Sequence, residues 1–259
     1  VSFTFSNATL AAGTYLVVAA DRTVFMAKYP GITNVVGSWE GTLGNNGESI
    51  RLVNAVGDTV DRVSYGTEGD WATRQRSAND MGTRGWIWNC PADGFGTSME
   101  LRNPFLGNNN GQNWVFNGPT GGTPGRVNSS FTNNVAPLIL DVAHSPLVPK
   151  TGELVAFTAR LVDESASGLG VTLYWRVDAN PQTNSFNALT MFDDQAHGDG
   201  AAGDGIFGAF LPVQTPHNTV IEFYVQAVDA GGRGNTWHRP AIAAVDGTGP
   251  TGQVVNALY

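Results

Sequence analysis

Apolar and polar residues alternate along much of this chain, and helical periodicity is rare. The alternation is clearest in the segments 153–163, 170–178 and 219–232. One face of the second segment carries Val171, Leu173, Trp175 and Val177. Successive side chains of a β-strand point to opposite faces, so each segment predicts a strand with one buried face. Short strands at this spacing, separated by turns, predict a sandwich of the seven-stranded type.

The first half of the chain predicts shorter strands, at 13–20, 47–54 and 59–66. Gly57 and Asp58 lie between the last two strands and favour a hairpin turn. The alternation within 59–66 is imperfect, which predicts a bulge or an added twist in that strand.

One segment, 21–30, predicts a helix. Asp21 is suited to cap its first turn, and Pro30 stops its last turn. No apolar run approaches the roughly 20 residues that a membrane helix needs, so no membrane span is expected.

Charged residues make up only 14% of the 259 residues, and the formal net charge is −8. A negative chain is a poor partner for the phosphate backbone of nucleic acids, so nucleic-acid binding is not expected. An acidic surface suits cations better. Cys90 is the only cysteine, which excludes a disulfide within the chain. Scarce cysteine and lysine, with abundant Asn and Gly, fit an extracellular or cell-surface bacterial protein.

A shift in composition predicts the domain boundaries. Residues 103–134 are rich in Asn and Gly, and alternating strands resume after them. We therefore expect a first domain at 1–128, a linker at 129–135, a second domain at 136–240 and a C-terminal extension at 241–259. The chain opens within a strand-like segment, so we expect a processed product or a piece of a longer polypeptide.

Several motifs of the first domain resemble those of the bacterial lamin-tail domain, and they occur in the family's order. Two strand motifs, G-x-x-I-x-L and D-x-V-x-Y, are matched by Gly47, Ile50, Leu52, Asp61, Val63 and Tyr65. The closing stretch NNNGQNWVFNGPTGGTPGRVN is also similar to the family. The resemblance covers about residues 1–130 and implies an immunoglobulin-like sandwich. The family's earlier strand with an E-I-x-N motif is absent, so we expect a domain truncated at its N-terminus.

Residues 135–240 resemble the immunoglobulin-like or fibronectin-III-like domain that often follows a lamin-tail domain in large exported bacterial surface proteins. The similar stretches include VTLYWRV, MFDDQAHGDGAAGDGIFGA and EFYVQAVDAGG. In many such proteins a spore-coat-type (CotH-like) kinase domain lies further on, and this chain contains none. Together the resemblances imply an all-β protein of two tandem immunoglobulin-like β-sandwiches. They also imply an accessory, surface-exposed module without a catalytic reaction of its own.

The densest run of small and acidic residues lies between two predicted strands and reads MFDDQAHGDGAAGDGIFG. Asp194, Asp199 and Asp204 recur at intervals of five, and Asp193 adds a fourth carboxylate. Calcium takes about six to eight oxygen ligands, and the flanking glycines let a loop coil, so these residues predict a calcium site. The alternative is a pair of solvated turns in which each Asp accepts backbone N–H bonds. A catalytic carboxylate pair is a third interpretation, because sequence does not give the distance between two acids.

The sequence contains no motif of a familiar catalytic type. The histidines lack metal-ligand spacing, Cys90 has no histidine nearby, and there is neither a nucleophile elbow nor a phosphate-binding loop. His197 lies within the aspartate run, but hard cations prefer oxygen to nitrogen. We expect this histidine to pack on the loop or face solvent, and we expect no enzymatic activity.

Trp86 and Trp88 occupy alternate positions in GWIWN, so a strand at 85–89 would present both rings on one face. Exposed together, they would form a platform on which a sugar ring stacks. Candidates to extend the platform are Trp39, Trp71 and Trp114. The alternative is that these rings anchor the sandwich core, as large aromatic side chains commonly do.

These expectations combine into a structural or adhesive module of an exported bacterial protein, stabilised by calcium and able to assemble through exposed strand edges. Its partners would be other protein domains or copies of itself. The alternative function is a carbohydrate-binding accessory module, in which Trp86 and Trp88 contact a glycan.

Overall fold

Strands are the main regular secondary structure in both of the units into which the chain divides. The computed structural model describes residues 1–6, 9–78, 80–81, 85–116, 119–179, 184–214, 218–237 and 257–258. The first unit comprises residues 1–72 and 88–132, and the second comprises residues 73–87 and 133–259. Among the described residues, no helix is long and apolar enough to cross a membrane.

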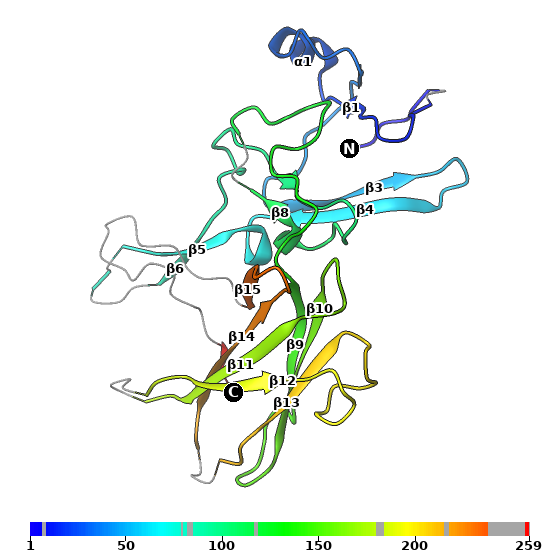
Figure 1. The fold of residues 1–259 in the computed structure, drawn as a ribbon. Helices are drawn as coiled ribbons and strands as arrows, with labels where there is room; N and C mark the ends of the chain where they lie inside the picture. The colour runs from blue at the N-terminus through cyan, green and yellow to red at the C-terminus, as the bar shows by residue number, and fades with distance from the viewer. Residues whose placement is uncertain are drawn as a thin grey trace. The chain divides into compact units, whose positions relative to one another are not determined.

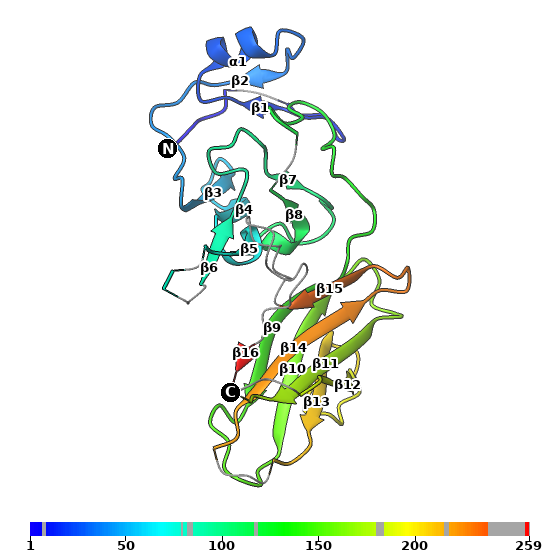
Figure 2. The ribbon, with the colours of Figure 1, turned by 90° about the vertical axis from the view of Figure 1, so that its left-hand side faces the viewer.

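The second unit contains two antiparallel sheets. One sheet has the order β13 (Ile206–Leu211), β10 (Val155–Val162), β9 (Leu138–Ser145). The other has the order β12 (Asn187–Met191), β11 (Gly170–Val177), β14 (Ile221–Val228), β15 (Gly234–Trp237). Figures 1 and 2 show the strands of this unit from two directions. The short strand β16 (Ala257–Leu258), which lies in the predicted C-terminal extension, also pairs with β14.

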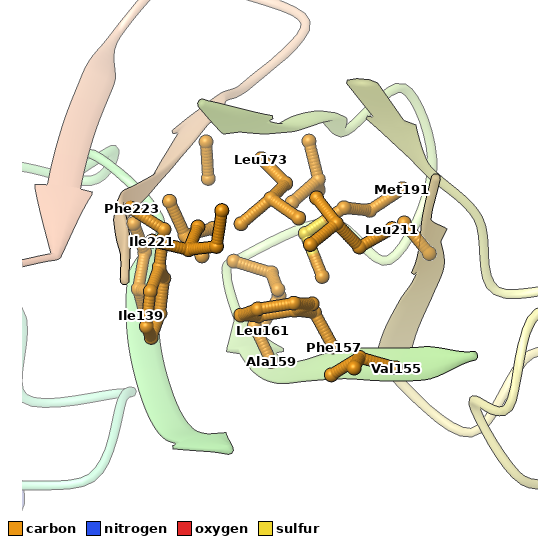
Figure 3. Packing of buried hydrophobic residues seen from close by; sticks show 14 residues of the cluster. Ile139, Val155, Phe157, Ala159, Leu161, Leu173, Met191, Leu211, Ile221 and Phe223 are labelled. Carbon is orange, nitrogen blue, oxygen red and sulfur yellow. The ribbon is translucent and has the colours of Figure 1, made fainter. Parts of the chain in front are cut away.

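Side chains from both sheets meet in one hydrophobic core (Figure 3). Phe157 of β10, Leu173 of β11 and Val225 of β14 are completely buried. Strands β10 and β14 alternate strictly between buried and half-buried residues. The buried faces predicted for 153–163 and 219–232 are therefore confirmed. Each large aliphatic side chain in this core stabilises the fold by roughly 1.5–3 kcal/mol.

The first unit contains the predicted helix and the predicted hairpin. Helix α1 spans Arg22–Lys28, and the Asp21 carboxylate accepts the Val24 N–H at 3.0 Å, which caps the first turn. Strands β3 (Gly47–Val53) and β4 (Thr59–Gly66) pair antiparallel, and their register shifts at Leu52–Val53. The helix at 21–30, the hairpin and its irregularity are therefore confirmed.

The remaining strands of the first unit are short. Strand β1 (Val17–Val18) pairs in parallel with β2 (Val35–Val36), and β7 (Glu100–Leu101) pairs with β8 (Trp114–Val115). The strand predicted over 13–20 is thus only two residues long. Within the described ranges, no sheet of this unit has more than two strands. The sheet of β5 (Thr73–Arg76) and β6 (Trp86–Asn89), whose residues fall mainly in the second unit, is also two-stranded. A single sandwich over 1–128 stays a prediction.

In the first unit, hydrogen bonds of side-chain amides connect segments that no large sheet connects. Asn113 is fully buried and donates to the carbonyl oxygens of Asn103 at 2.8 Å and Gly107 at 3.2 Å. Asn108 donates to the Asp61 carboxylate of β4 at 2.8 Å, and Asn109 accepts the Ser64 N–H of the same strand. The Asn-rich segment therefore binds the β3–β4 hairpin through the side-chain amides of Asn108 and Asn109, one bonded to a side chain and the other to the backbone.

A buried carboxylate, that of Glu100 in β7, binds the last segment of the first unit. It accepts hydrogen bonds from the Thr123 hydroxyl at 2.7 Å, the Ser129 hydroxyl at 2.7 Å and the Ser130 N–H at 3.1 Å. Ser129 and Ser130 belong to the segment predicted as a linker. Burial alone would raise the pKa of Glu100, but the hydrogen bonds from Ser129, Thr123 and Ser130 outweigh it and lower the pKa. The predicted linker is thus anchored at its start, and Val135, at its end, is buried and donates its N–H to Glu164 at 2.9 Å.

We expect Glu100→Gln to reduce the free energy of unfolding of the first unit by roughly 1–3 kcal/mol at neutral pH, because the donors lose a charged acceptor. The folded-state pKa is lowered, so the charged form contributes stability above the ordinary value of 4.5, and that contribution is lost as the pH falls below it. Urea unfolding at several pH values should show the gap between wild type and variant shrinking in acid. Glu40→Gln, at an exposed carboxylate of the same unit, is the matched control.

Candidate functional site

The aspartate-rich segment forms a loop that leads from one sheet of the second unit to the other. Strand β12 ends at Met191 and β13 begins at Ile206, as the sequence predicted. Figure 1 shows the loop between them in yellow. Phe192 and Gly208 exchange two backbone hydrogen bonds of 2.8 Å at its base. The loop is therefore fixed to β13 at the point where the chain changes sheets.

Asp199 is the centre of the loop, and only 1% of its surface is exposed. One carboxylate oxygen accepts the N–H groups of Asp194 at 2.7 Å and Gln195 at 2.8 Å, and the other accepts the N–H of His197 at 2.9 Å. Burial alone would raise the pKa of Asp199, but the bonds from these amides outweigh it and lower the pKa. Three backbone N–H groups of the first turn thus point toward the charged carboxylate.

Two glycines allow this arrangement. Gly198 and Gly200, on either side of Asp199, have φ angles of 77° and 101°, which favour glycine. In β13, a Cβ atom on Gly208 would lie 2.4 Å from the His197 carbonyl oxygen and 3.0 Å from the Asp199 Cβ. Only glycine fits where the strand passes beneath the buried carboxylate.

Asp193 and Asp204 close the second turn. The half-buried Asp193 carboxylate accepts the N–H groups of Gly203 at 2.6 Å and Gly205 at 2.9 Å. Asp204 accepts the N–H of Ala201 at 3.0 Å and of Ile206 at 2.9 Å. Both residues therefore hold backbone amides of the loop that contains them.

Asp194 pairs with the histidine of the loop. One oxygen of its exposed carboxylate lies 2.9 Å from the His197 Nδ1 atom and 2.9 Å from the Ala196 N–H. The hydrogen bond from His197 is the main cause that lowers the pKa of Asp194, and the Ala196 amide adds to it. The His197 ring packs on Phe192, with ring centroids 4.7 Å apart. His197 packs on the loop, which is one of the two placements that the sequence predicted.

The four carboxylates point toward backbone amides. Each accepts at least one N–H. Asp194 and Asp204 accept the N–H two residues further on, as in an Asx turn. A calcium ion needs about six to eight oxygens converging on one point. Within the part of the chain that the structure describes, no group of three or more His, Cys, Asp or Glu side chains is placed to hold a metal. The geometry supports the turn interpretation, and calcium binding at Asp193, Asp194, Asp199 and Asp204 stays a prediction.

The predicted Trp86–Trp88 platform is described only in part. Strand β6 contains both residues, and Trp88 is half-buried, whereas Ile87 between them is 49% exposed. The side chain of Trp86 lies outside the described residues. A sugar platform formed by these two rings therefore stays a prediction.

Two other tryptophans named from the sequence do come together. Trp71 and Trp114 lie in the first unit with ring centroids 5.7 Å apart and an interplanar angle of 44°. Trp71 ends the 3-10 helix η1 (Gly69–Trp71), and Trp114 directly follows the 3-10 helix η2 (Gly111–Asn113).

We expect Asp199→Asn to lower the free energy of unfolding of the second unit by roughly 1–3 kcal/mol at neutral pH, since three amides share its two charged oxygens. The pKa is lowered in the folded state, so this contribution exists above the ordinary value of 3.8 and disappears as the pH falls. Denaturation at neutral and acidic pH measures both effects. Asp141→Asn, which removes an exposed ion pair with Arg160, should cost about 0–1 kcal/mol. Equal costs for the two variants would contradict a central role for Asp199.

No protein-family model matches this chain, and no curated protein matches it.

Proposed function

We propose that this chain is a non-catalytic structural module of an exported bacterial protein, in which a lamin-tail-like unit precedes a fibronectin-III-like or immunoglobulin-like unit. The module would hold neighbouring parts of a longer polypeptide, or other copies of itself, at a fixed spacing. Its location would be the cell surface or the extracellular space.

The strand order of the second unit supports this assignment. Strands β9, β10 and β13 form one sheet, strands β11, β12, β14 and β15 form the other, and both cover one core. Apart from the two-residue strand β16, which also pairs with β14, seven antiparallel strands are divided three and four over a shared core. This division fits the architecture of fibronectin-III-like and immunoglobulin-like domains. Domains of this architecture serve many proteins as surface modules, and the fold alone does not assign a function.

The single observation that carries the proposal is the role of the loop carboxylates. A general acid, a general base or a metal ligand must present its oxygens to a substrate or an ion. Here Asp193, Asp199 and Asp204 present theirs to backbone amides of their own loop. The carboxylates of the most acidic segment thus stabilise the conformation of their own loop. This role fits a spacer module better than an enzyme.

The β3–β4 hairpin supports the adhesive part of the proposal. No third strand pairs with it among the described residues. Val60 is 63% exposed, and Ile50 and Leu52 also expose large parts of their side chains. Two-stranded ribbons with free edges and apolar side chains are prone to pair with another chain. The alternative function, glycan binding by Trp86 and Trp88, has no described geometry to support it.

Thermal unfolding in chelator and with added calcium tests whether the aspartate-rich loop binds calcium. If the loop carboxylates hold only amides, as in the turn interpretation, the melting temperature of the second unit is the same in both conditions. A cation that binds only the folded state raises stability in proportion to the logarithm of its concentration. A melting temperature that falls in chelator and recovers with calcium would establish the calcium-bound form of the loop, and Asp204→Asn should then abolish the recovery.

Self-association is tested by sedimentation over a wide range of protein concentration. We expect the wild-type sedimentation coefficient to rise with concentration and Val60→Lys to suppress the rise, because a charge on the ribbon opposes edge pairing. Val24→Lys is the matched control, since Val24 on helix α1 is equally exposed, at 65%. A wild-type protein that stays monomeric at every concentration removes self-assembly from the proposal.

A further inference from the structure

The first unit contains a hollow that has no part in the proposed structural function. Its volume is about 360 Å³, and its apolar lining includes Leu43, Ile50, Val63, Tyr65, Trp71 and Trp114. Ile50, Val63 and Tyr65 belong to one face of the β3–β4 hairpin, on which the register places Ile50 opposite Val63. The volume is in the range of small-ligand sites, which are mostly apolar with a few polar groups.

The segments that carry the two tryptophans at this hollow are connected by close contacts. A Cβ atom on Gly111 would lie 2.3 Å from the Asp70 carbonyl oxygen and 2.6 Å from the Trp71 nitrogen, so only glycine lets η2 approach η1 this closely. Gln112 donates to the Asp70 carboxylate at 2.9 Å, and the Trp114 indole donates to the Asn108 carbonyl at 2.7 Å. The backbone at Trp71 is thus packed against η2, and a hydrogen bond orients the Trp114 ring before any ligand arrives.

Polar groups at the hollow remain available to a ligand. Asn45, Thr67 and Asp93 line it, and their side chains have no hydrogen-bond partner among the described residues. The same holds for the Trp71 indole N–H. Donors and acceptors thus line the same hollow as two half-buried aromatic rings.

We propose that the hollow bounded by Trp71, Trp114 and Tyr65 binds a neutral saccharide unit. A pyranose ring has C–H faces that pack on the electron-rich faces of aromatic side chains, and its hydroxyls bond to amide, hydroxyl and carboxylate groups. Asp93 is the one charged residue among those that line the hollow, and its negative charge disfavours sulfated or uronic-acid sugars. This inference goes beyond the proposed structural role and does not depend on it.

Affinity electrophoresis of the full chain tests the site, with soluble neutral polysaccharides in the gel as probes. We expect the wild type to be retarded and Trp71→Ala to weaken the apparent affinity by about tenfold. Asp93→Ala should weaken binding by a smaller factor and leave the fold intact, because Asp93 is exposed and its carboxylate has no partner among the described residues. Trp39→Phe, at a half-buried tryptophan outside the hollow, should bind as the wild type does.

Unretarded migration of the wild type on every neutral polysaccharide would overturn the proposal. So would retardation that both Trp71→Ala and Asp93→Ala leave unchanged, or retardation by acidic polysaccharides alone. Melting curves identify a Trp71→Ala protein that fails to fold, and Asp93→Ala then decides. Self-association is measured separately by sedimentation, so failure of the structural proposal and failure of this site give different results.

Discussion

A buried carboxylate surrounded by hydrogen-bond donors is the interaction on which the irregular parts of both units depend. Asp199 gathers three amides of the loop between β12 and β13. Glu100 gathers two hydroxyls and an amide from residues 123–130. Loops rich in Gly, Asn and Ser offer many backbone donors and few apolar side chains, and buried donors left without acceptors are costly. A charged acceptor that serves several donors at once solves this problem with one side chain.

The two units differ in what stabilises them. The second unit has a core to which both sheets contribute. In the described part of the first unit, the buried hydrophobic residues are only Ala19, Val35, Ala72 and Cys90. Hydrogen bonds that Asn113 and Asn108 donate and that Glu100 accepts connect its short strands and loops instead. Such bonds contribute modestly when made and cost more when broken, so the first unit is the more sensitive to single polar substitutions.

Sequence patterns predicted the elements whose structure is set locally. The period of two in β10 and β14 identified the buried residues because a strand in a two-layer sheet has one inner face. Asp21 located the start of α1, since capping involves only the next few residues. The direction of each loop carboxylate was not predictable: Asp199 is buried and Asp204 exposed within the same repeated spacing. Nor was the meeting of Trp71 with Trp114, which depends on a close approach of backbones far apart in sequence at Gly111.

The hydrogen bonds of Asp199 have a consequence for proteolysis. A surface loop of glycine and other small residues is ordinarily where a protease first cuts, because such a loop opens locally with little loss of contacts. A protease must pull the segment into an extended form, and here that form requires the amides of Asp194, Gln195 and His197 to leave the buried carboxylate. The free energy of this local opening sets the rate of cleavage when reclosing is fast. The residue that shapes the loop therefore also opposes cleavage of the chain within this loop.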